Sequence, residues 1–235
     1  MATLQKKIKL AFLVLFFGLA WSLPASPVRD SISGKVIVQG YERPYASEVE
    51  YLESDVNQFI DIWPQTGHEE SLKVECGFML IGSDRMKNYH VFIPSPNGST
   101  WNFQEGPRLY RYYDGLRVAC DGAKGITISN LGFKRRCDAE VLYSNHNTIE
   151  WNVDGISGSA SRTYYIKGNK VIRLFGDVKT NLTGRIYYFR LYIDGVLVRD
   201  LVPFRLGDVG CMYDKVSGDM LFNDGDGEFI LGPDL

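Results

Sequence analysis

The chain has 235 residues, of which 45% are hydrophobic, 23% charged and 13% aromatic, and its formal net charge is −2. This composition excludes a disordered or low-complexity chain. The near balance of 26 basic and 28 acidic residues argues against a nucleic-acid partner, because such proteins usually carry a clear basic excess. The 24 glycines, 13 Phe and 14 Tyr favour a β protein with many turns.

Residues 1–25 have the composition of a signal peptide. Lys6, Lys7 and Lys9 precede the apolar run Leu10–Trp21, and a segment with small residues follows it. The run is shorter than the roughly 20 residues that a spanning helix needs. We therefore expect cleavage after Ala25, no stable membrane insertion of the mature chain, and a secreted, periplasmic or cell-surface location. An uncleaved membrane anchor is the alternative.

Residues 26–47 are rich in Ser, Pro and Gly and are predicted to form a linker, with a possible edge strand at Lys35–Val38. From residue 48 to 235, short β-type runs alternate with turn signals, and we find no convincing helical periodicity. The Asp-Gly pairs, such as Asp154-Gly155 and Asp194-Gly195, favour the tight turns of hairpins. The pattern predicts an all-β domain, either a sandwich or a barrel. The predicted strands include Leu72–Ile81, Tyr89–Ile93, Ile126–Ile128, Thr148–Val153, Thr163–Ile166, Lys170–Phe175, Arg185–Ile193 and Val196–Leu201.

The strand Arg185–Ile193 has a clear two-residue alternation. One face is predicted to be core and carries Tyr187, Phe189, Leu191 and Ile193. The other face is amphipathic and partly open to water; it carries Tyr188, Arg190 and Tyr192. Pro203 is expected to stop ladder pairing in the following strand.

Four cysteines lie in the exported part of the chain. Their spacing does not fit a zinc site, because the chain has no C-x-x-C motif and no nearby histidine pair. In an oxidising compartment Cys120 and Cys137 are the preferred disulfide, since they bracket a loop-like stretch. Four unpaired cysteines are the alternative, because Cys76 and Cys211 lie in segments predicted to be core.

Several motifs resemble a known family. Residues 49–61 contain YLES and QFID, and the C-terminal part reads GRIYYF at 184–189, LVRDLVP at 197–203, GDVGCMYD at 207–214 and GDGEFILGPD at 225–234. Together they resemble the LamG-like module of bacterial and phage type, in the concanavalin A-like lectin/glucanase superfamily. The resemblance covers roughly residues 49–235 and implies an antiparallel two-sheet β-sandwich, a jelly roll, over residues 48–235. The sequence departs from the family at Ile62 and Trp63, which replace a Thr-Gly pair.

Some members of that superfamily are glycoside hydrolases, so the chain was searched for their E-x-D-x-x-E arrangement. Glu48, Glu50 and Glu53 come nearest, but Glu50 stands where the motif has Asp. The three histidines occur without a G-x-S-x-G motif. No catalytic residue and no metal ligand is therefore assigned. Residues 224–228, DGDGE, lack the Gly and Glu of a calcium loop, so no cofactor is expected beyond the structural calcium ion that LamG-type modules can carry.

Glycans are recognised by aromatic rings and a few planar polar groups. Candidate binding residues lie in turn-rich or Arg/Tyr-rich segments: Trp63, Trp101, Tyr110, Arg111, Tyr112 and Tyr113. The alternative is that these side chains pack in the sandwich, as Trp151 is expected to do between Ile149 and Val153. The sequence thus predicts an exported non-catalytic binding or adhesion module for a glycan or a surface protein, in an oligomeric state that it leaves open. The alternatives are a structural component of a surface or tail-like particle and a laminarinase-like glycoside hydrolase.

Overall fold

The computed structural model describes most of the chain after residue 45 and three short segments before it. The described residues are 28–29, 36–38, 41–43, 46–55, 57–66, 71–81, 89–94, 106–112, 115–120, 126–128, 134–144, 147–161, 170–177, 180–181 and 183–235. The predicted signal peptide, residues 1–25, lies outside them, as does the predicted strand Thr163–Ile166. None of the described residues is helical, and this part of the chain contains no helix long and apolar enough to cross a membrane.

The chain divides into two units, Met1–Ala46 and Ser47–Leu235. The first unit contains a small antiparallel sheet in the order β1-β2-β3. Its strands are β1 (Val28–Arg29), β2 (Val36–Val38) and β3 (Tyr41–Arg43). The second unit carries the candidate site and is described below.

The larger sheet of the second unit has eleven strands among the described residues. Its main path runs β14-β13-β12-β7-β18-β19-β20-β21, while β5 pairs with β18 and β22, and β4 pairs with β19. The strands are β4 (Ala46–Glu48), β5 (Leu52–Ser54), β7 (Ser71–Leu80), β12 (Cys137–Ser144), β13 (Thr148–Val153), β14 (Ile156–Ser161), β18 (Gly184–Ile193), β19 (Val196–Leu206), β20 (Val209–Asp214), β21 (Met220–Leu221) and β22 (Ile230–Leu231).

The smaller sheet has the strand order β11-β10-β9-β8-β15-β6. A separate two-stranded pair follows β15 along the chain. Its strands are β6 (Ile60–Thr66), β8 (Tyr89–Pro94), β9 (Arg108–Tyr112), β10 (Gly115–Ala119), β11 (Ile126–Ile128) and β15 (Lys170–Leu174). The extra pair is β16 (Gly176–Asp177) with β17 (Thr180–Asn181). Strand pairing is antiparallel in both sheets, for example between β7 and β12 and between β8 and β9.

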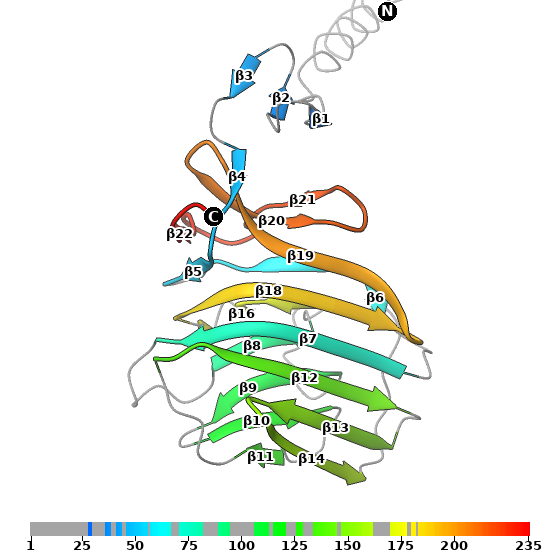
Figure 1. The fold of residues 1–235 in the computed structure, drawn as a ribbon. Helices are drawn as coiled ribbons and strands as arrows, with labels where there is room; N and C mark the ends of the chain where they lie inside the picture. The colour runs from blue at the N-terminus through cyan, green and yellow to red at the C-terminus, as the bar shows by residue number, and fades with distance from the viewer. Residues whose placement is uncertain are drawn as a thin grey trace, which may run out of the picture. The chain divides into compact units, whose positions relative to one another are not determined.

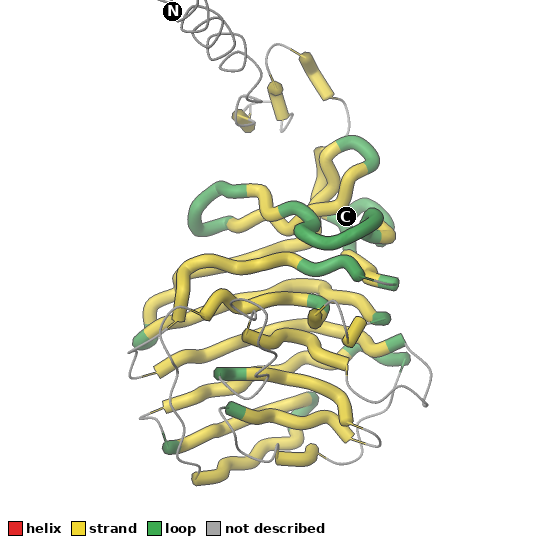
Figure 2. The backbone as a smooth tube through the Cα atoms, turned by 180° about the vertical axis from the view of Figure 1, so that it is seen from behind, coloured by secondary structure: helices red, strands yellow, loops and turns green. Residues whose placement is uncertain are grey.

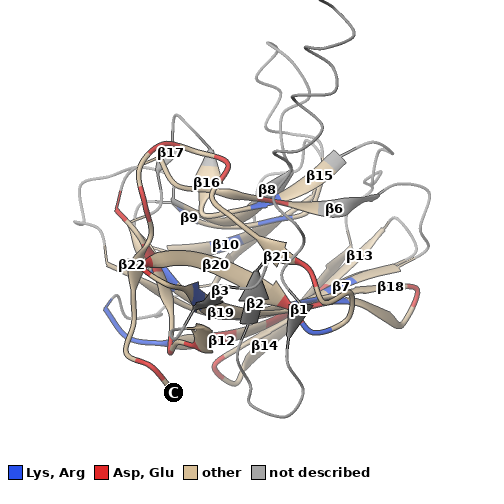
Figure 3. Ribbon diagram, turned by 90° about the horizontal axis from the view of Figure 1, so that it is seen from above, with Lys and Arg blue, Asp and Glu red and all other residues tan. Residues whose placement is uncertain are grey.

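The two sheets face each other across one hydrophobic core. Figure 1 shows β7, β12 and β13 in front of β8, β9 and β10, and Figure 2 shows the same arrangement from behind. Seen from above, β6, β8 and β15 lie in one layer and β7, β13 and β18 in the other (Figure 3). Across the core, Phe92 meets Phe189 edge to face with ring centroids 5.9 Å apart. The Tyr143 hydroxyl donates to the carbonyl oxygens of Arg108 and Ala119, at 3.3 and 3.4 Å. The predicted antiparallel β-sandwich is confirmed.

Both Asp-Gly hairpins named from the sequence are present. Asp154 and Gly155 have φ of 49° and 81°, and Asp194 and Gly195 have φ of 48° and 79°. Positive φ at both central residues defines the type I′ turn, whose twist matches that of the flanking strands. These turns join β13 to β14 and β18 to β19.

The predicted core face of β18 is wrong at Tyr187, and Ile193 is only half-buried. The register shifts between Ile186, opposite Phe78, and Tyr188, opposite Gly77, so Tyr187 is the extra residue of a β-bulge. The bulge turns Tyr187 away from the core. On that side its ring centroid lies 5.8 Å from that of Tyr51. Ile186 takes the inward position before the bulge, and Phe189 and Leu191 occupy it afterwards as expected.

The expectation that Pro203 stops ladder pairing is also wrong, because β19 continues to Leu206. Pro203 pairs with Met212 of β20, while its carbonyl accepts from Val49 N–H at 3.1 Å. The N–H and C=O of one strand residue point to the same side. The N–H that proline lacks would therefore point toward Val49. Pro203 thus removes no backbone hydrogen bond between β19 and β20.

Candidate functional site

The six predicted binding residues are not brought together on a described surface. Trp63 lies in β6 and Tyr112 in β9, but their side chains are outside the described part of the structure, and Trp101 and Tyr113 are outside it entirely. Tyr110 and Arg111 are only 8% and 2% exposed. The Tyr110 ring lies 5.3 Å from that of His90, and the Arg108 guanidinium lies 5.4 Å from the Tyr110 ring centre. A ring so enclosed offers no open face to a sugar, so Tyr110 and Arg111 act here as packed residues.

The structure describes all four cysteines, and none of them forms a disulfide. The predicted Cys120–Cys137 bridge is absent: Cys120 directly follows β10 of the smaller sheet, and Cys137 begins β12 of the larger sheet, opposite Phe78. All four thiols are buried. Burial raises the pKa of Cys137 and of Cys211 to about 12, so these two are protonated at neutral pH.

The solvent-facing side of the larger sheet carries rows of polar side chains, which we call the outer face. One row crosses five strands through Ser157, Asn152, Glu140, Glu75 and Arg190. A parallel row two residues away contains Ser159, Glu150, Leu142, Lys73 and Tyr192. These rows exist because residues two apart on a strand share a face and register partners stand side by side.

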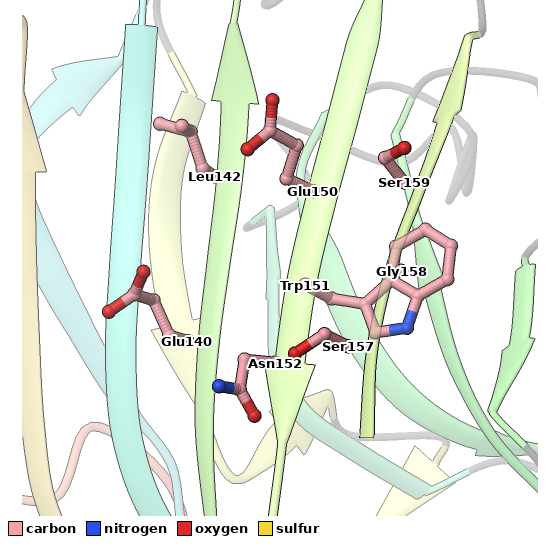
Figure 4. A pocket seen from close by; sticks show the side chains of 8 residues that line it. All are labelled: Glu140, Leu142, Glu150, Trp151, Asn152, Ser157, Gly158 and Ser159. Carbon is pink, nitrogen blue, oxygen red and sulfur yellow. The ribbon is translucent and has the colours of Figure 1, made fainter. Parts of the chain in front are cut away.

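Two adjoining depressions in the outer face form one groove. The first, about 470 Å³, lies over β12, β13 and β14 and is lined by Glu140, Leu142, Glu150, Trp151, Asn152, Ser157, Gly158 and Ser159 (Figure 4). The second, about 390 Å³, extends toward β7 and β18 and is lined by Glu75, Asp138, Ala139, Glu140, Asn152, Asp154, Gly155 and Tyr188. Glu140 and Asn152 line both. Each volume is in the range of small-ligand sites.

Two glycines on these strands leave room for aromatic rings, Gly77 on the outer face and Gly158 on the side of the core. A Cβ on Gly77 would lie 2.6 Å from Cε1 of Tyr188, so the Tyr188 ring covers the backbone of β7 at this point. A Cβ on Gly158 would lie 2.3 Å from Cζ2 of Trp151, and Figure 4 shows that ring over Gly158. Trp151 packs against the core, as its alternation with Ile149 and Val153 predicts. Tyr188 is half-buried on the outer face and is the ring available to a ligand.

A chain of opposite charges crosses the outer face beside the groove. Lys73 Nζ lies 2.6 Å from Glu75, Arg190 lies 3.6 Å from Glu75, and Arg190 Nε donates to Asp200 at 2.9 Å. Burial alone would raise the pKa of Glu75, but the hydrogen bond from Lys73, helped by Tyr192 and Arg190, lowers it overall. The pKa of Lys73 is correspondingly raised, chiefly by its hydrogen bond to Glu75.

Glu75 and Glu140 are register partners and so form a pair of carboxylates on neighbouring strands. Such partners have Cβ atoms about 5 Å apart, and retaining glycosidases use two carboxyl groups at about that separation. The general acid of such a pair needs a raised pKa. Glu75 has the opposite shift, and Lys73 contacts both carboxylates, at 2.6 and 3.9 Å. Glu75 is therefore held as a carboxylate and is not suited to deliver a proton.

The described residues contain no group of three or more His, Cys, Asp or Glu side chains that could hold a metal ion. The acidic segment that resembles a calcium loop fastens the chain to β6 instead. Asn223 Oδ1 accepts from the backbone N–H of Phe59 at 3.1 Å and of Gly225 at 2.9 Å. Asp224 Oδ2 accepts from Asp61 N–H at 2.9 Å. Backbone donors thus occupy Asn223 Oδ1 and Asp224 Oδ2.

Sequence reasoning assigned Tyr188 and Arg190 to a partly wet face but missed the groove beside them. β12, β13 and β14 follow one another along the chain, but β7 and β18 join them only through pairings between segments far apart in the sequence. Each polar residue looks, on its own strand, like an ordinary solvent-facing residue. The glycines opposite Tyr188 and Trp151 were the available signal, since glycine inside a strand often marks a close approach.

No family model matches the sequence. No curated protein matches it either. A solved structure of a putative carbohydrate-binding protein from Bacteroides ovatus has a TM-score of 0.56 at 11% identity, covering 80% of this chain and 60% of that one. The native heptameric SAP-like pentraxin from Limulus polyphemus has a TM-score of 0.51 at 9% identity, covering 80% of this chain and 94% of that one. This chain therefore spans less than two thirds of the Bacteroides ovatus chain, and likeness at such low identity concerns the fold. The fold is a two-sheet antiparallel jelly roll.

Proposed function

We propose that this chain is an exported, non-catalytic binding module that recognises a glycan in the groove on the outer face of the larger sheet. The observation that carries the proposal is the groove itself: planar polar side chains, Asn152 and the carboxylates of Glu140 and Glu150, line a continuous depression that ends at the half-buried Tyr188 ring. Aromatic faces bind the C–H surfaces of sugars, and planar polar groups fix their hydroxyls.

Three further observations support this proposal. The lectin-like jelly roll also occurs in a protein described as a putative carbohydrate-binding protein. The lowered pKa of Glu75 suits a hydrogen-bond acceptor better than an acid catalyst. The signal-peptide composition of residues 1–25 supports export to a place where glycans or surface proteins are the available partners.

A glycan array probed with the purified full-length chain, expressed so that any natural N-terminal cleavage occurs, tests this function. We expect Tyr188→Ala and Asn152→Ala each to weaken binding about tenfold, since one lost contact of this kind is worth roughly 1.4 kcal/mol. Tyr213→Ala is the matched control: Tyr213 is a half-buried tyrosine of β20 that lines neither depression, and its ring lies 5.6 Å from that of Phe204. Binding by this variant should be unchanged.

Two results would redirect or reject the proposal. Loss of binding in Trp63→Ala or Trp101→Ala, with none in Tyr188→Ala, would move the ligand to the residues predicted from sequence. Absence of binding to every glycan would reject glycan recognition, and a pull-down of surface proteins would then be the next assay. Release of reducing sugar from a polysaccharide panel, abolished by Glu140→Gln, would establish the hydrolase alternative instead.

A further inference from the structure

The free edge of β14 differs from the other sheet edges among the described residues. The larger sheet ends at β14 on one side and at the two-residue β21 on the other. The smaller sheet ends at the three-residue β11 and at β6, which contains Pro64. Short strands and prolines are the usual means of keeping an edge from pairing. β14 has six residues, reads ISGSAS, and contains neither a charge nor a proline.

The hairpin geometry determines which backbone groups this edge presents. A two-residue type I′ turn is closed by a hydrogen-bonded pair, here Val153 with Ile156. Hydrogen-bonded and non-hydrogen-bonded pairs then alternate along the two strands. Ile156, Gly158 and Ala160 therefore bond to β13. Ser157, Ser159 and Ser161 direct their N–H and C=O groups away from it, toward the free edge, and all three serines are exposed.

We propose that this edge pairs with β14 of a second copy of the chain, antiparallel and about a two-fold axis at Ser159. In this register Ser159 faces Ser159 of the second copy, and Ser157 faces Ser161. All three outward-facing serines then form hydrogen-bonded pairs, and the larger sheets of the two copies become one continuous sheet.

The composition of β14 fits a copy of itself better than an unrelated strand. The non-hydrogen-bonded pairs, where strands come closest, with Cα atoms about 4.5 Å apart, would place Gly158 opposite Ala160. These are the two smallest residues of the strand, so the close approach meets no bulky side chain. An isologous two-fold contact requires this kind of self-complementarity.

The pairing has a structural consequence for the groove. Ser157, Gly158 and Ser159 line the groove on the outer face. A dimer through β14 would therefore set the grooves of two copies side by side across the two-fold axis. This consequence rests on the proposed glycan function, whereas the dimer itself does not and is tested without glycan.

Sedimentation of the purified full-length chain over a nanomolar to high-micromolar series tests the dimer. We expect a monomer–dimer equilibrium in the natural chain. Ser159→Pro should raise its dissociation constant about tenfold or more, because each copy loses one inter-copy N–H donor. The proline removes no bond to β13, so far-UV circular dichroism should be unchanged, and Ser159→Ala, which keeps the N–H, is the matched control that should still dimerise.

Charge substitutions test the register. Ser159→Lys and Ser159→Glu should each be monomeric, because like charges would meet at the two-fold axis. An equimolar mixture should form a one-to-one heterodimer. A natural chain that stays monomeric over the whole series would overturn the proposal. A dimer whose dissociation constant does not change in Ser159→Pro would also overturn it, because the contact would then lie elsewhere. Failure of Ser159→Lys and Ser159→Glu to form a heterodimer would overturn it as well.

Discussion

The two sheets differ in how far the face turned away from the core is exposed to water. On the larger sheet this face is open: Arg190 is 43% exposed at its side chain, and it joins a chain of surface charges beside the groove. On the smaller sheet the corresponding face carries His90, Arg108, Tyr110 and Arg173, all of which are buried. Arg173 makes two short hydrogen bonds to Asp61, at 2.6 and 2.8 Å, and its guanidinium lies 3.7 Å from the ring centre of Phe59.

This comparison shows that a polar strand face is not by itself a binding face. Charged residues buried on the smaller sheet are committed to fixed partners, and replacing one partner leaves the other without compensation. Charged residues on the larger sheet keep contact with water and can exchange it for a ligand. We therefore expect substitutions on the smaller sheet to affect stability and those on the larger sheet to affect binding.

The largest expected difference concerns one arginine from each sheet. Arg173→Ala should lower the free energy of unfolding by about 3 kcal/mol, because it removes a buried guanidinium and leaves the half-buried Asp61 carboxylate without its partner. Arg190→Ala should cost less than about 1 kcal/mol, since the Arg190 side chain is 43% exposed and water screens its ion pairs. Urea denaturation of both variants measures this. Equal losses would contradict the distinction between the two faces.

The buried histidine of the smaller sheet should make the protein acid-sensitive. Burial, aided by the neighbouring Arg108, lowers the pKa of His90 to about 3 from the ordinary 6.5. Between these two pKa values His90 is protonated in the unfolded chain but not in the folded chain. The free energy of unfolding therefore falls as the pH falls, by up to about 1.4 kcal/mol per pH unit. At pH 5 the loss from His90 should be about 2 kcal/mol.

His90→Gln isolates this effect, because glutamine stays neutral throughout. The slope of the unfolding free energy between pH 7 and 5 should be smaller in the variant than in the natural chain, whatever the substitution costs at pH 7. His68 and His146 contribute equally to both proteins and cancel in the comparison. Identical slopes would show that His90 binds a proton in the folded chain as readily as in the unfolded chain.

Two glycines extend the comparison to backbone contacts. Gly158→Ala should cost about 1.5 kcal/mol, because the added Cβ would strike the Trp151 ring, which core packing holds in place. Gly115→Ala, on the smaller sheet, should cost less. Its Cβ would meet Cγ2 of the exposed Thr127 side chain at 2.6 Å, which can rotate away. Thermal or urea unfolding of the two variants gives the order, and a reversed order would contradict this reading of the contacts.

The smallest expected effect is that of reductant. Since no disulfide links the two sheets, dithiothreitol should leave the melting temperature unchanged, and the intact mass should correspond to four thiols. A melting temperature that drops on reduction would instead support the Cys120–Cys137 disulfide predicted from the sequence.

The parts of the fold that sequence predicted correctly are local. Asp154-Gly155 and Asp194-Gly195 form their hairpins because two residues suffice to define a type I′ turn. Phe189 and Leu191 lie in the core because alternation is a property of the strand itself. The errors concern contacts with other strands. The bulge at Tyr187 depends on the register with β7, and the tolerance of Pro203 depends on Val49 lying beside it.

The amino-acid sequence by itself determined the class of this protein: its alternation, turn residues and aromatic content are consistent with an antiparallel sandwich and little else. Only the tertiary structure decided which polar side chains share a groove. Tyr110 and Arg111, candidate binding residues from the sequence, are enclosed, whereas Glu140, Asn152 and Tyr188, which look like ordinary strand residues in the sequence, line one depression. The physical reason is that a strand specifies two faces through its own period of two residues. Which neighbour lies beside that strand, and whether a face stays open to water, depends on pairings between segments distant along the chain.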